Sequence, residues 1–292
     1  MDLCFVGGGN MASALIGGLI EGDTLIRSIH VIEPLDAARG VLEEKFSAKA
    51  KKHNLRFVVY HADAPESLVE TAESVWVVLA VKPQQMRKAC EQAPTNLRSL
   101  LSRASILSIA AGISIEAITA WCNTSQVVRA MPNTPALIRQ GITGLYAPAS
   151  ISEKQRLEVN EIMQSVGQTL WMDDETLLDA VTALSGSGPA YVFLFVEALS
   201  RAGVRLGLNP DHALTLTLKT LEGALALMRT SHATPAELRG QVTSKGGTTA
   251  AALASLQRAE FSEIVERALK AARDRGAEIS REHYSGRPDL DP

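Results

Sequence analysis

The chain has 292 residues, of which 46% are hydrophobic and 21% charged, a composition typical of a soluble globular protein of about two domains. Its formal net charge of -3 gives no basic surface for nucleic acid. The N-terminal apolar run ends at Gly7–Gly9, too early for a signal peptide. The apolar run Pro189–Val196 is too short to span a bilayer, so no membrane partner is expected.

Strand-like and helix-like stretches alternate through the first half, which predicts a doubly wound, mostly parallel α/β sheet with crossover helices. The expected strands are Leu3–Val6, His30–Ile32, Phe57–Tyr60, Val75–Val81, Ile106–Ile109, Val127–Val128, a further edge strand at Ile142–Tyr146 and a last strand at Thr169–Met172. The expected helices are Asn10–Ile20, Asp36–Lys52 and Ser152–Ser165. Val75–Val81 is nearly all apolar and β-branched, which is typical of a strand buried on both faces.

The character of the sequence changes after Asp173 and Asp174, where strand patterns give way to long helical ones. This change predicts a sheet domain at 1–173 and an all-α C-terminal domain at 174–284. The tail at 285–292 has too little apolar content to pack and is expected to be disordered.

Two prolines in the helical half, Pro189 and Pro210, fit the first turn of a helix. Leu214–Met228 is apolar on most faces of a helix, which predicts that it lies in a core or an interface.

The three cysteines, Cys4, Cys90 and Cys122, lie far apart, with no Cys-x-x-Cys motif and no nearby histidine. This spacing predicts buried thiols, a cytoplasmic location and no metal site.

A G-x-G-x-x-A motif formed by Gly7, Gly9 and Ala12 lies between the first strand and the first helix. The first glycine permits a tight turn, the second admits a pyrophosphate, and the small third residue lets helix and strand pack closely. Glu33 ends the second strand, where an acidic side chain holds the ribose 2′-hydroxyl of NAD and repels a 2′-phosphate. The motif predicts a dinucleotide site and slightly favours NADH over NADPH.

Residues just past the other strands are expected to line the same crevice, because ligands of such sheets bind at the carboxyl ends of the strands. Lys82, before the helix-initiating Pro83, faces either the cofactor or the substrate carboxylate, or is a surface lysine. Ala110 and Ala111 leave room for a flat ring. The loop Met131–Pro135 is rigid and follows Arg129, which is a site residue or a salt-bridge residue.

The stretch Thr243–Thr249 reads Thr-Ser-Lys-Gly-Gly-Thr-Thr and precedes an alanine-rich helix that Thr248 or Ser244 can cap. Adjacent glycines let the backbone approach a ligand, and the start of a helix offers free N–H groups to a small carboxylate. Because this stretch lies far from the dinucleotide motif, it predicts a second ligand.

Together these segments resemble pyrroline-5-carboxylate reductases along nearly the whole chain. The matching stretches are Gly7–Ala12, Ala80–Gln84, Arg129–Pro135, Ser185–Tyr191 and Thr243–Thr249. The resemblance implies a Rossmann domain followed by a helical domain that interleaves with a second copy to form a homodimer, and commonly a decamer built as a pentamer of dimers. It also implies reduction of the ring C=N of 1-pyrroline-5-carboxylate to L-proline with NADPH or NADH.

The resemblance implies a role for each matching residue. Thr249 would hydrogen-bond the ring nitrogen, and Ser244, Gly246, Gly247 and Thr248 would hold the substrate carboxylate. Lys82 is assigned to both the substrate and the cofactor, near the nicotinamide ribose. The expected cofactor residues are Gly7, Gly8, Gly9, Asn10, Met11, Ala12, Glu33, Ala80, Val81, Lys82, Pro83, Ala110, Ala111 and Asn133.

The chain departs from the family pattern at Lys245, where many relatives have proline, at Ala252, where they have glycine, and at His232, where some carry a carboxylate. Lys245 is expected to face solvent and His232 to lie in a loop. One alternative is another two-domain dehydrogenase, such as a β-hydroxyacid dehydrogenase or an imine reductase. These enzymes generally rely on a catalytic lysine or carboxylate in the first long helix of the second domain, and the corresponding stretch Ser185–Tyr191 has no lysine. The other alternative is a nucleotide-sensing or scaffolding protein without hydride transfer.

Overall fold

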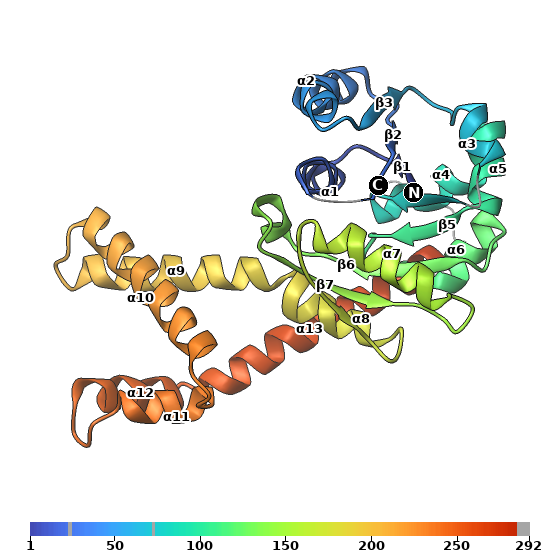
Figure 1. Ribbon diagram of the computed structural model, residues 1–292. Coiled ribbons are helices and arrows are strands. Elements are labelled where there is room, and N and C mark those ends of the chain that lie inside the picture. The colour runs from blue at the N-terminus through green and yellow to red at the C-terminus, as the bar shows by residue number, and fades with distance from the viewer. Residues whose placement is uncertain (23–24, 72–73, 285–292) are drawn as a thin grey trace, which may run out of the picture. The chain divides into compact units, whose positions relative to one another are not determined.

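The computed structural model describes residues 1–22, 25–71 and 74–284, with the backbone alone at 280 and 282–284. Eight strands form one sheet in the order β3-β2-β1-β4-β5-β6-β7-β8 (Figure 1). The strands are β1 (Asp2–Val6), β2 (Ser28–Ile32), β3 (Arg56–Tyr60), β4 (Val75–Leu79), β5 (Ser105–Ser108), β6 (Val127–Met131), β7 (Gly141–Tyr146) and β8 (Gly167–Trp171). Every neighbouring pair is parallel except β6 and β7, which are antiparallel.

Helices cover both faces of the sheet, and further helices follow the last strand in the sequence. Those up to Gly186 are α1 (Asn10–Glu21), α2 (Asp36–Lys52), α3 (Glu66–Glu70), α4 (Pro83–Glu91), α5 (Thr95–Arg103), α6 (Ile115–Cys122), the 3-10 helix η2 (Thr134–Ile138), α7 (Glu153–Gln164), α8 (Leu177–Val181) and the π-helix η3 (Thr182–Gly186). The rest are α9 (Gly188–Arg205), α10 (Pro210–Thr230), α11 (Pro235–Gln241), α12 (Thr248–Arg258) and α13 (Phe261–Tyr284).

The predicted doubly wound, mostly parallel sheet is confirmed, and α2 has the predicted ends. The prediction of an edge strand at Ile142–Tyr146 is wrong: β7 lies inside the sheet because β8 pairs with it in parallel, so that β3 and β8 are the edges. Periodicity also missed α3, α5 and α6, whose short apolar faces lack the repeated turns that identify a longer helix.

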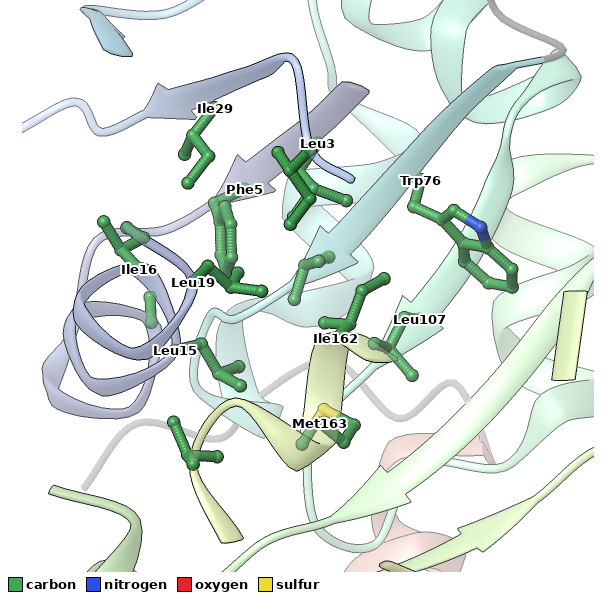
Figure 2. Close-up of a cluster of buried hydrophobic side chains, with 14 of the residues drawn as sticks. Leu3, Phe5, Leu15, Ile16, Leu19, Ile29, Trp76, Leu107, Ile162 and Met163 are labelled. Atoms are coloured by element: carbon green, nitrogen blue, oxygen red, sulfur yellow. The ribbon is translucent and has the colours of Figure 1, made fainter. Parts of the chain in front are cut away.

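The core consists of two layers because side chains alternate along the buried strands. On β1, Leu3 and Phe5 join the layer beneath α1, α2 and α7, which Figure 2 shows together with Trp76 of β4. Cys4 and Val6 point to the other face and join the layer beneath α3, α4, α5 and α6. β1 is buried over its whole length on both faces, as expected for a central parallel strand.

The chain reverses direction across the sheet between β1 and β4. It runs from β1 outward through β2 to the edge strand β3, then crosses back to place β4 on the other side of β1. The carboxyl ends of β1 and β4 therefore diverge into helices on opposite faces, and doubly wound sheets bind ligands at this position.

The contacts divide the chain into two compact units. Unit 1 comprises Met1–Ser187 and the stretch that begins at Ala272, and unit 2 comprises Gly188–Ala271. This division falls 14 residues after the end of the predicted sheet domain at Asp173 (187 against 173). The expected tail at 285–292 lies outside the described residues.

Unit 2 has almost no interior of its own. Ala213 and Thr217 of α10 are its two buried residues, although every residue of the unit is described. Apart from Thr217, the stretch Leu214–Met228, expected in a core or an interface, is not buried within this chain: Leu216 and Leu227 are more than half exposed. The helical stretch Leu177–Arg205 is long and apolar enough to cross a membrane by length and composition, and 11% of its most apolar window is buried.

A buried polar chain runs across β1, β2 and β3 in unit 1. The His30 ring makes hydrogen bonds through Nδ1 with the Tyr60 hydroxyl (3.1 Å) and through Nε2 with Ser28 Oγ (2.9 Å), and Ser28 Oγ donates to Asp2 Oδ1 (2.8 Å). Burial lowers the pKa of His30 from 6.5 to about 4; the positive charge of Arg56 adds to this effect and the charge of Asp2 opposes it.

His30 is therefore neutral in the folded chain and takes up a proton on unfolding below about pH 6.5. Its contribution to stability is complete above pH 6.5 and is lost as the pH falls from 6.5 towards 4. When the pH is lowered from 7.5 to 5, the free energy of unfolding of the wild type should fall by about 2 kcal/mol more than that of His30→Gln. Denaturation in urea across this pH range measures the difference, with the exposed His53→Gln as control. Parallel pH profiles for wild type and His30→Gln would contradict a neutral buried His30.

Candidate functional site

The turn from β1 to α1 has a backbone that glycine alone adopts without strain. Gly7 has a φ of +96°, and a Cβ there would lie 2.9 Å from the carbonyl oxygen of Ala80. The Gly7 N–H donates to Ile32 O (2.9 Å) at the end of β2, and the Ala80 N–H donates to Val6 O (2.9 Å). The turn is thus held against the ends of both neighbouring strands.

Glu33 connects this turn to the end of β2. Its Oε2 accepts from the Gly8 N–H (2.9 Å) and its Oε1 from the Leu35 N–H (3.0 Å), and the residue is 8% exposed. A Cβ at position 8 would lie 2.5 Å from Leu42 Cδ1, so a side chain there would require Leu42 to shift. The sequence motif predicts a contact between Glu33 and the ribose but does not indicate that the Glu33 carboxylate orders the glycine turn. Two accepted bonds leave a carboxylate further lone pairs for a ribose hydroxyl.

α1 begins at this turn without a side-chain cap. Gly9 is its N-cap, and no atom lies within 4 Å of the position that a Cβ would take there. The first-turn N–H groups of Asn10, Met11 and Ala12 are therefore available to an anion in open space. The Ala12 side chain is buried against the sheet, as expected for the third motif position. This cradle fits a dinucleotide pyrophosphate.

The end of β4 borders the same turn. Ala80 and Val81 follow the strand directly and approach Gly7, and Lys82 is the exposed N-cap residue of α4, with Pro83 at its first position. The parallel register of β1 and β4 brings these residues to the edge that carries the glycine turn. Lys82 thus places an exposed cation at this edge.

The loop after β5 meets the returning end of α13. Gly112 has a φ of +73°, and a Cβ there would lie 3.0 Å from Ile279 Cγ2 and 3.4 Å from Gly276 O. The small residue thus serves a helix contact within unit 1, which the sequence did not reveal. Ala110 is buried and Ala111 half-buried beside it, on the same edge of the sheet.

Arg129 on β6 is a buried salt-bridge residue, which decides between the two roles that the sequence left open. Its Nη1 donates to Glu175 Oε1 at 2.7 Å, and the same oxygen accepts from the Ile115 N–H (2.8 Å). The ion pair joins β6 to the segment just before α8 and to the start of α6. Its role is to fix the end of β6.

Both polar atoms of the Asn133 side chain, Oδ1 and Nδ2, make hydrogen bonds within the chain. Its Oδ1 accepts from the Ile142 N–H (3.0 Å), and its Nδ2 donates to the carbonyl oxygen and the hydroxyl of Ser185 (both 3.3 Å). Pro189 has no N–H to donate to the Ser185 carbonyl four residues earlier, so a partner from elsewhere is needed. Asn133 supplies it at the π-helix η3, and these bonds position the loop after β6.

The stretch Thr243–Thr249 forms a second uncapped helix start, in unit 2. Gly247 is the N-cap of α12, so the prediction that Thr248 or Ser244 caps this helix is wrong. A Cβ at position 247 would lie 2.4 Å from Ser244 Oγ, so a side chain there would require the Ser244 hydroxyl to move. Gly246 has a φ of +75° with open space around it. Thr248 and Thr249 are the first two residues of α12, and their N–H groups have no side-chain cap.

The residues that depart from the family pattern lie where the sequence placed them. Lys245 is exposed, and His232 is exposed in the loop between α10 and α11.

The three cysteines are buried and free. Burial raises the pKa of the Cys4 thiol to about 12, and the pKa of Cys122 is raised by its hydrogen bond with Cys90 and by burial. Thiols held protonated in this way are poor nucleophiles. Within residues 1–22, 25–71 and 74–284, no group of three or more His, Cys, Asp or Glu is placed to hold a metal ion.

Both halves of the chain match known proteins. A pyrroline-5-carboxylate reductase of Pseudomonas aeruginosa is 42% identical over 279 residues, 95% of this chain and 96% of the relative. The chain belongs to the pyrroline-5-carboxylate reductase family. A second relative of the same name, from Pasteurella multocida, is 36% identical over 96% of this chain and 98% of its own length.

Family models and solved structures agree with this assignment. Residues 175–279 match the model for pyrroline-5-carboxylate reductase dimerisation, and residues 2–112 match that for coenzyme F420-dependent NADP oxidoreductases. A pyrroline-5-carboxylate reductase from Coxiella burnetii has a TM-score of 0.80 at 34% identity and covers 95% of this chain and 98% of its own. The Plasmodium falciparum pyrroline carboxylate reductase, solved with NADP bound, has a TM-score of 0.76 at 28% identity and covers 96% and 98%.

The dimerisation match accounts for the exposed apolar residues of unit 2. Its range covers all of α9, α10, α11 and α12, whose leucines and phenylalanines have no buried layer within the chain. Apolar surface of this extent is covered in a stable soluble protein. The chain therefore forms a homo-oligomer through this half.

The open space at Gly9 predicts the effect of a single methyl group. Ala fits the φ of −65° there without a clash, so Gly9→Ala should fold at a cost of about 1 kcal/mol for a poorer N-cap. The methyl would occupy the pyrophosphate cradle and should weaken dinucleotide binding by about tenfold or more, which is about 1.4 kcal/mol. Isothermal titration calorimetry measures the affinity.

Gly40→Ala is the matched control. Position 40 is exposed on α2 with no atom within 4 Å of a Cβ, so alanine should leave affinity unchanged and stabilise the helix by about 1 kcal/mol. Unchanged affinity in Gly9→Ala would place the pyrophosphate elsewhere.

Proposed function

We propose that this chain reduces 1-pyrroline-5-carboxylate to L-proline, the last step of proline biosynthesis, in the cytoplasm. The observation that carries the proposal is the similarity to pyrroline-5-carboxylate reductases over 95% of the chain. The family models match the glycine turn, within residues 2–112, and the start of α12, within residues 175–279. The cofactor is NAD(P)H, which supplies a hydride when bound at the edge of the sheet.

The reaction requires one hydride and one proton. Hydride adds to the imine carbon, the C=N π bond breaks, and its electron pair remains on nitrogen, which gains or already carries the proton. A cyclic imine is basic enough to arrive partly as an iminium, already activated for attack. The protein then contributes mainly by holding the two reactants in the right orientation.

The start of α12 is the proposed carboxylate site. Ser244, Gly246, Gly247 and Thr248 surround an uncapped helix start, where N–H groups and the helix dipole favour a negative charge. No atom lies within 4 Å of the position that a Cβ would take at Gly246, and at Gly247 the lack of a Cβ leaves room for Ser244 Oγ beside the helix start. These features suit a small carboxylate.

Thr249 is the proposed partner of the ring nitrogen. It is the second residue of α12 and half-buried, whereas Thr248 is exposed. An unperturbed hydroxyl is a weak acid, so its role is to orient the imine by a hydrogen bond rather than to supply the proton by itself.

The cofactor residues proposed for unit 1 lie on one edge of the sheet. Gly7, Gly8 and Gly9 with Asn10, Met11 and Ala12 would hold the pyrophosphate, and Glu33 the adenosine ribose. The other proposed contacts with the dinucleotide are Ala80, Val81, Lys82, Pro83, Ala110, Ala111 and Asn133. The uncapped start of α1 and the parallel register of β1 and β4 support this assignment. Lys82 is also proposed as a substrate contact, since a cation beside the nicotinamide suits a carboxylate.

The functional division that we propose is a dinucleotide domain at 1–173 and a helical dimerisation and substrate domain at 174–284. The dimerisation match at 175–279 supports it. A homodimer is the expected basic assembly and a decamer, a pentamer of dimers, the expected larger one; the apolar surface of α9 and α10 supports association. Light scattering coupled to size exclusion measures the assembly, and a monomer at micromolar concentration would contradict it.

The purified protein should oxidise NADH or NADPH when 1-pyrroline-5-carboxylate is added, followed by the loss of absorbance at the nicotinamide band. Product analysis should give one proline for each dinucleotide oxidised. Failure with both cofactors would overturn the proposed reaction. Turnover of a β-hydroxyacid in place of the imine would favour the alternative dehydrogenase.

The Thr249 hydroxyl can be tested with a side chain of the same shape. Thr249→Val should lower kcat about tenfold, since one hydrogen bond in the transition state amounts to about 1.4 kcal/mol. Dinucleotide affinity should stay within about twofold, because Thr249 lies outside the cofactor residues. Thr249→Ser, which keeps the hydroxyl, is the matched control and should retain most of the rate. A valine variant as fast as wild type would remove Thr249 from the reaction.

A further inference from the structure

We propose that the ion pair between Asp36 and Arg39 makes this chain discriminate against the 2′-phosphate of NADP by holding the only nearby guanidinium of α2 in an internal contact. The inference rests on the proposed dinucleotide site and extends it to cofactor preference. It concerns the connection from β2 to α2, where a doubly wound sheet places the adenosine ribose.

The connection is short and buried at its start. β2 ends at Ile32, Glu33 is 8% exposed, and α2 begins at Asp36. The Glu33 carboxylate accepts from Gly8 in the glycine turn, so the segment that would face the ribose is tied to the segment that would face the pyrophosphate. A 2′-phosphate would therefore arrive beside Glu33 and the first turn of α2.

Arg39 projects back along α2 onto this connection. Its Nη1 donates to the carbonyl oxygens of Glu33 and Pro34, both at 3.0 Å, and its Nη2 donates to Asp36 Oδ1. The Arg39 side chain is 20% exposed, whereas that of Asp36 is 87% exposed. Arg39 is thus committed to two carbonyls and one carboxylate, and an exposed carboxylate lies on its outer side.

This arrangement has opposite consequences for the two cofactors. A guanidinium near this position accommodates the 2′-phosphate in NADP-binding sheets of this type. Here the Asp36 carboxylate accepts a hydrogen bond from Nη2 of Arg39 and offsets the charge of the guanidinium. Glu33 adds a second negative charge. NAD has a ribose hydroxyl in place of the phosphate, so neither feature opposes it. Asp36 is a positioning residue that acts through Arg39.

Replacement of Asp36 by asparagine releases Arg39 while keeping the side-chain shape. Asp36→Asn should tighten NADP⁺ about tenfold, equivalent to about 1.4 kcal/mol and typical of one charge-assisted hydrogen bond. NAD⁺ affinity should change less than about twofold. Calorimetric titration with each oxidised dinucleotide, in the absence of the imine, measures both constants for the whole protein.

A double-mutant cycle separates release of Arg39 from simple loss of a negative charge. In an Arg39→Met background, Asp36→Asn should give no gain for NADP⁺, because there is no guanidinium to release. An equal gain in both backgrounds would mean direct repulsion by Asp36 and would overturn the proposal, as would no gain in either. Should Arg39→Met not fold, Arg39→Gln replaces it, since glutamine also lacks the charge.

Glu44→Gln is the control for net charge. Glu44 is exposed on the same helix, eight residues and about 12 Å of helix length from Asp36, and its loss should leave the ratio of NAD⁺ to NADP⁺ affinity unchanged. A gain equal to that of Asp36→Asn would overturn the proposal. Because the titrations contain no imine, a protein that binds dinucleotides as expected but does not reduce 1-pyrroline-5-carboxylate would contradict only the proposed reaction.

Discussion

The close approach of the glycine turn to the end of β4 is the constraint on which the nucleotide half depends. At Gly7 the backbone lies so near the Ala80 carbonyl that a single methyl group would clash. This approach aims α1 along the crevice between β1 and β4 and leaves the N–H of Gly8 in reach of Glu33. The edge of the sheet acquires a fixed anion cradle because the backbone, rather than a mobile side chain, forms it.

The two proposed ligand sites share one structural feature, a helix that begins at a glycine N-cap. Gly9 begins α1 and Gly247 begins α12, and neither helix has a side-chain cap. By contrast, α7 and α11 begin with full capping boxes at Ser152 and Thr234, whose hydroxyls accept from one first-turn N–H group each, that of Gln155 or Glu237. A cap stabilises a helix but occupies one of the donors that an anion needs. Other helices also begin without a side-chain cap, behind Leu35, Lys82 and Pro94, but at α1 and α12 the N-cap is a glycine, so the N-cap itself places no side chain beside the free donors.

The helical half depends on association. With Ala213 and Thr217 as its buried residues, unit 2 gains little hydrophobic stabilisation from its own packing. Its apolar side chains contribute to stability when a second copy covers them. The proposed carboxylate site at α12 lies in this unit, so the order of that site and the assembly of the protein are expected to be linked.

The sequence by itself determined the order of the strands, the ends of α2, the glycine motif and the family, because each depends on local periodicity or on motifs that few residues define. Only the tertiary structure decided that β7 is an internal strand, since an edge is defined by which strands pair and not by composition. It likewise decided that Glu33 orders the glycine turn and that Asn133 bonds Ser185, 52 residues away. A hydrogen bond between distant segments leaves no periodic pattern in the sequence, so these partners can be identified only from the folded structure.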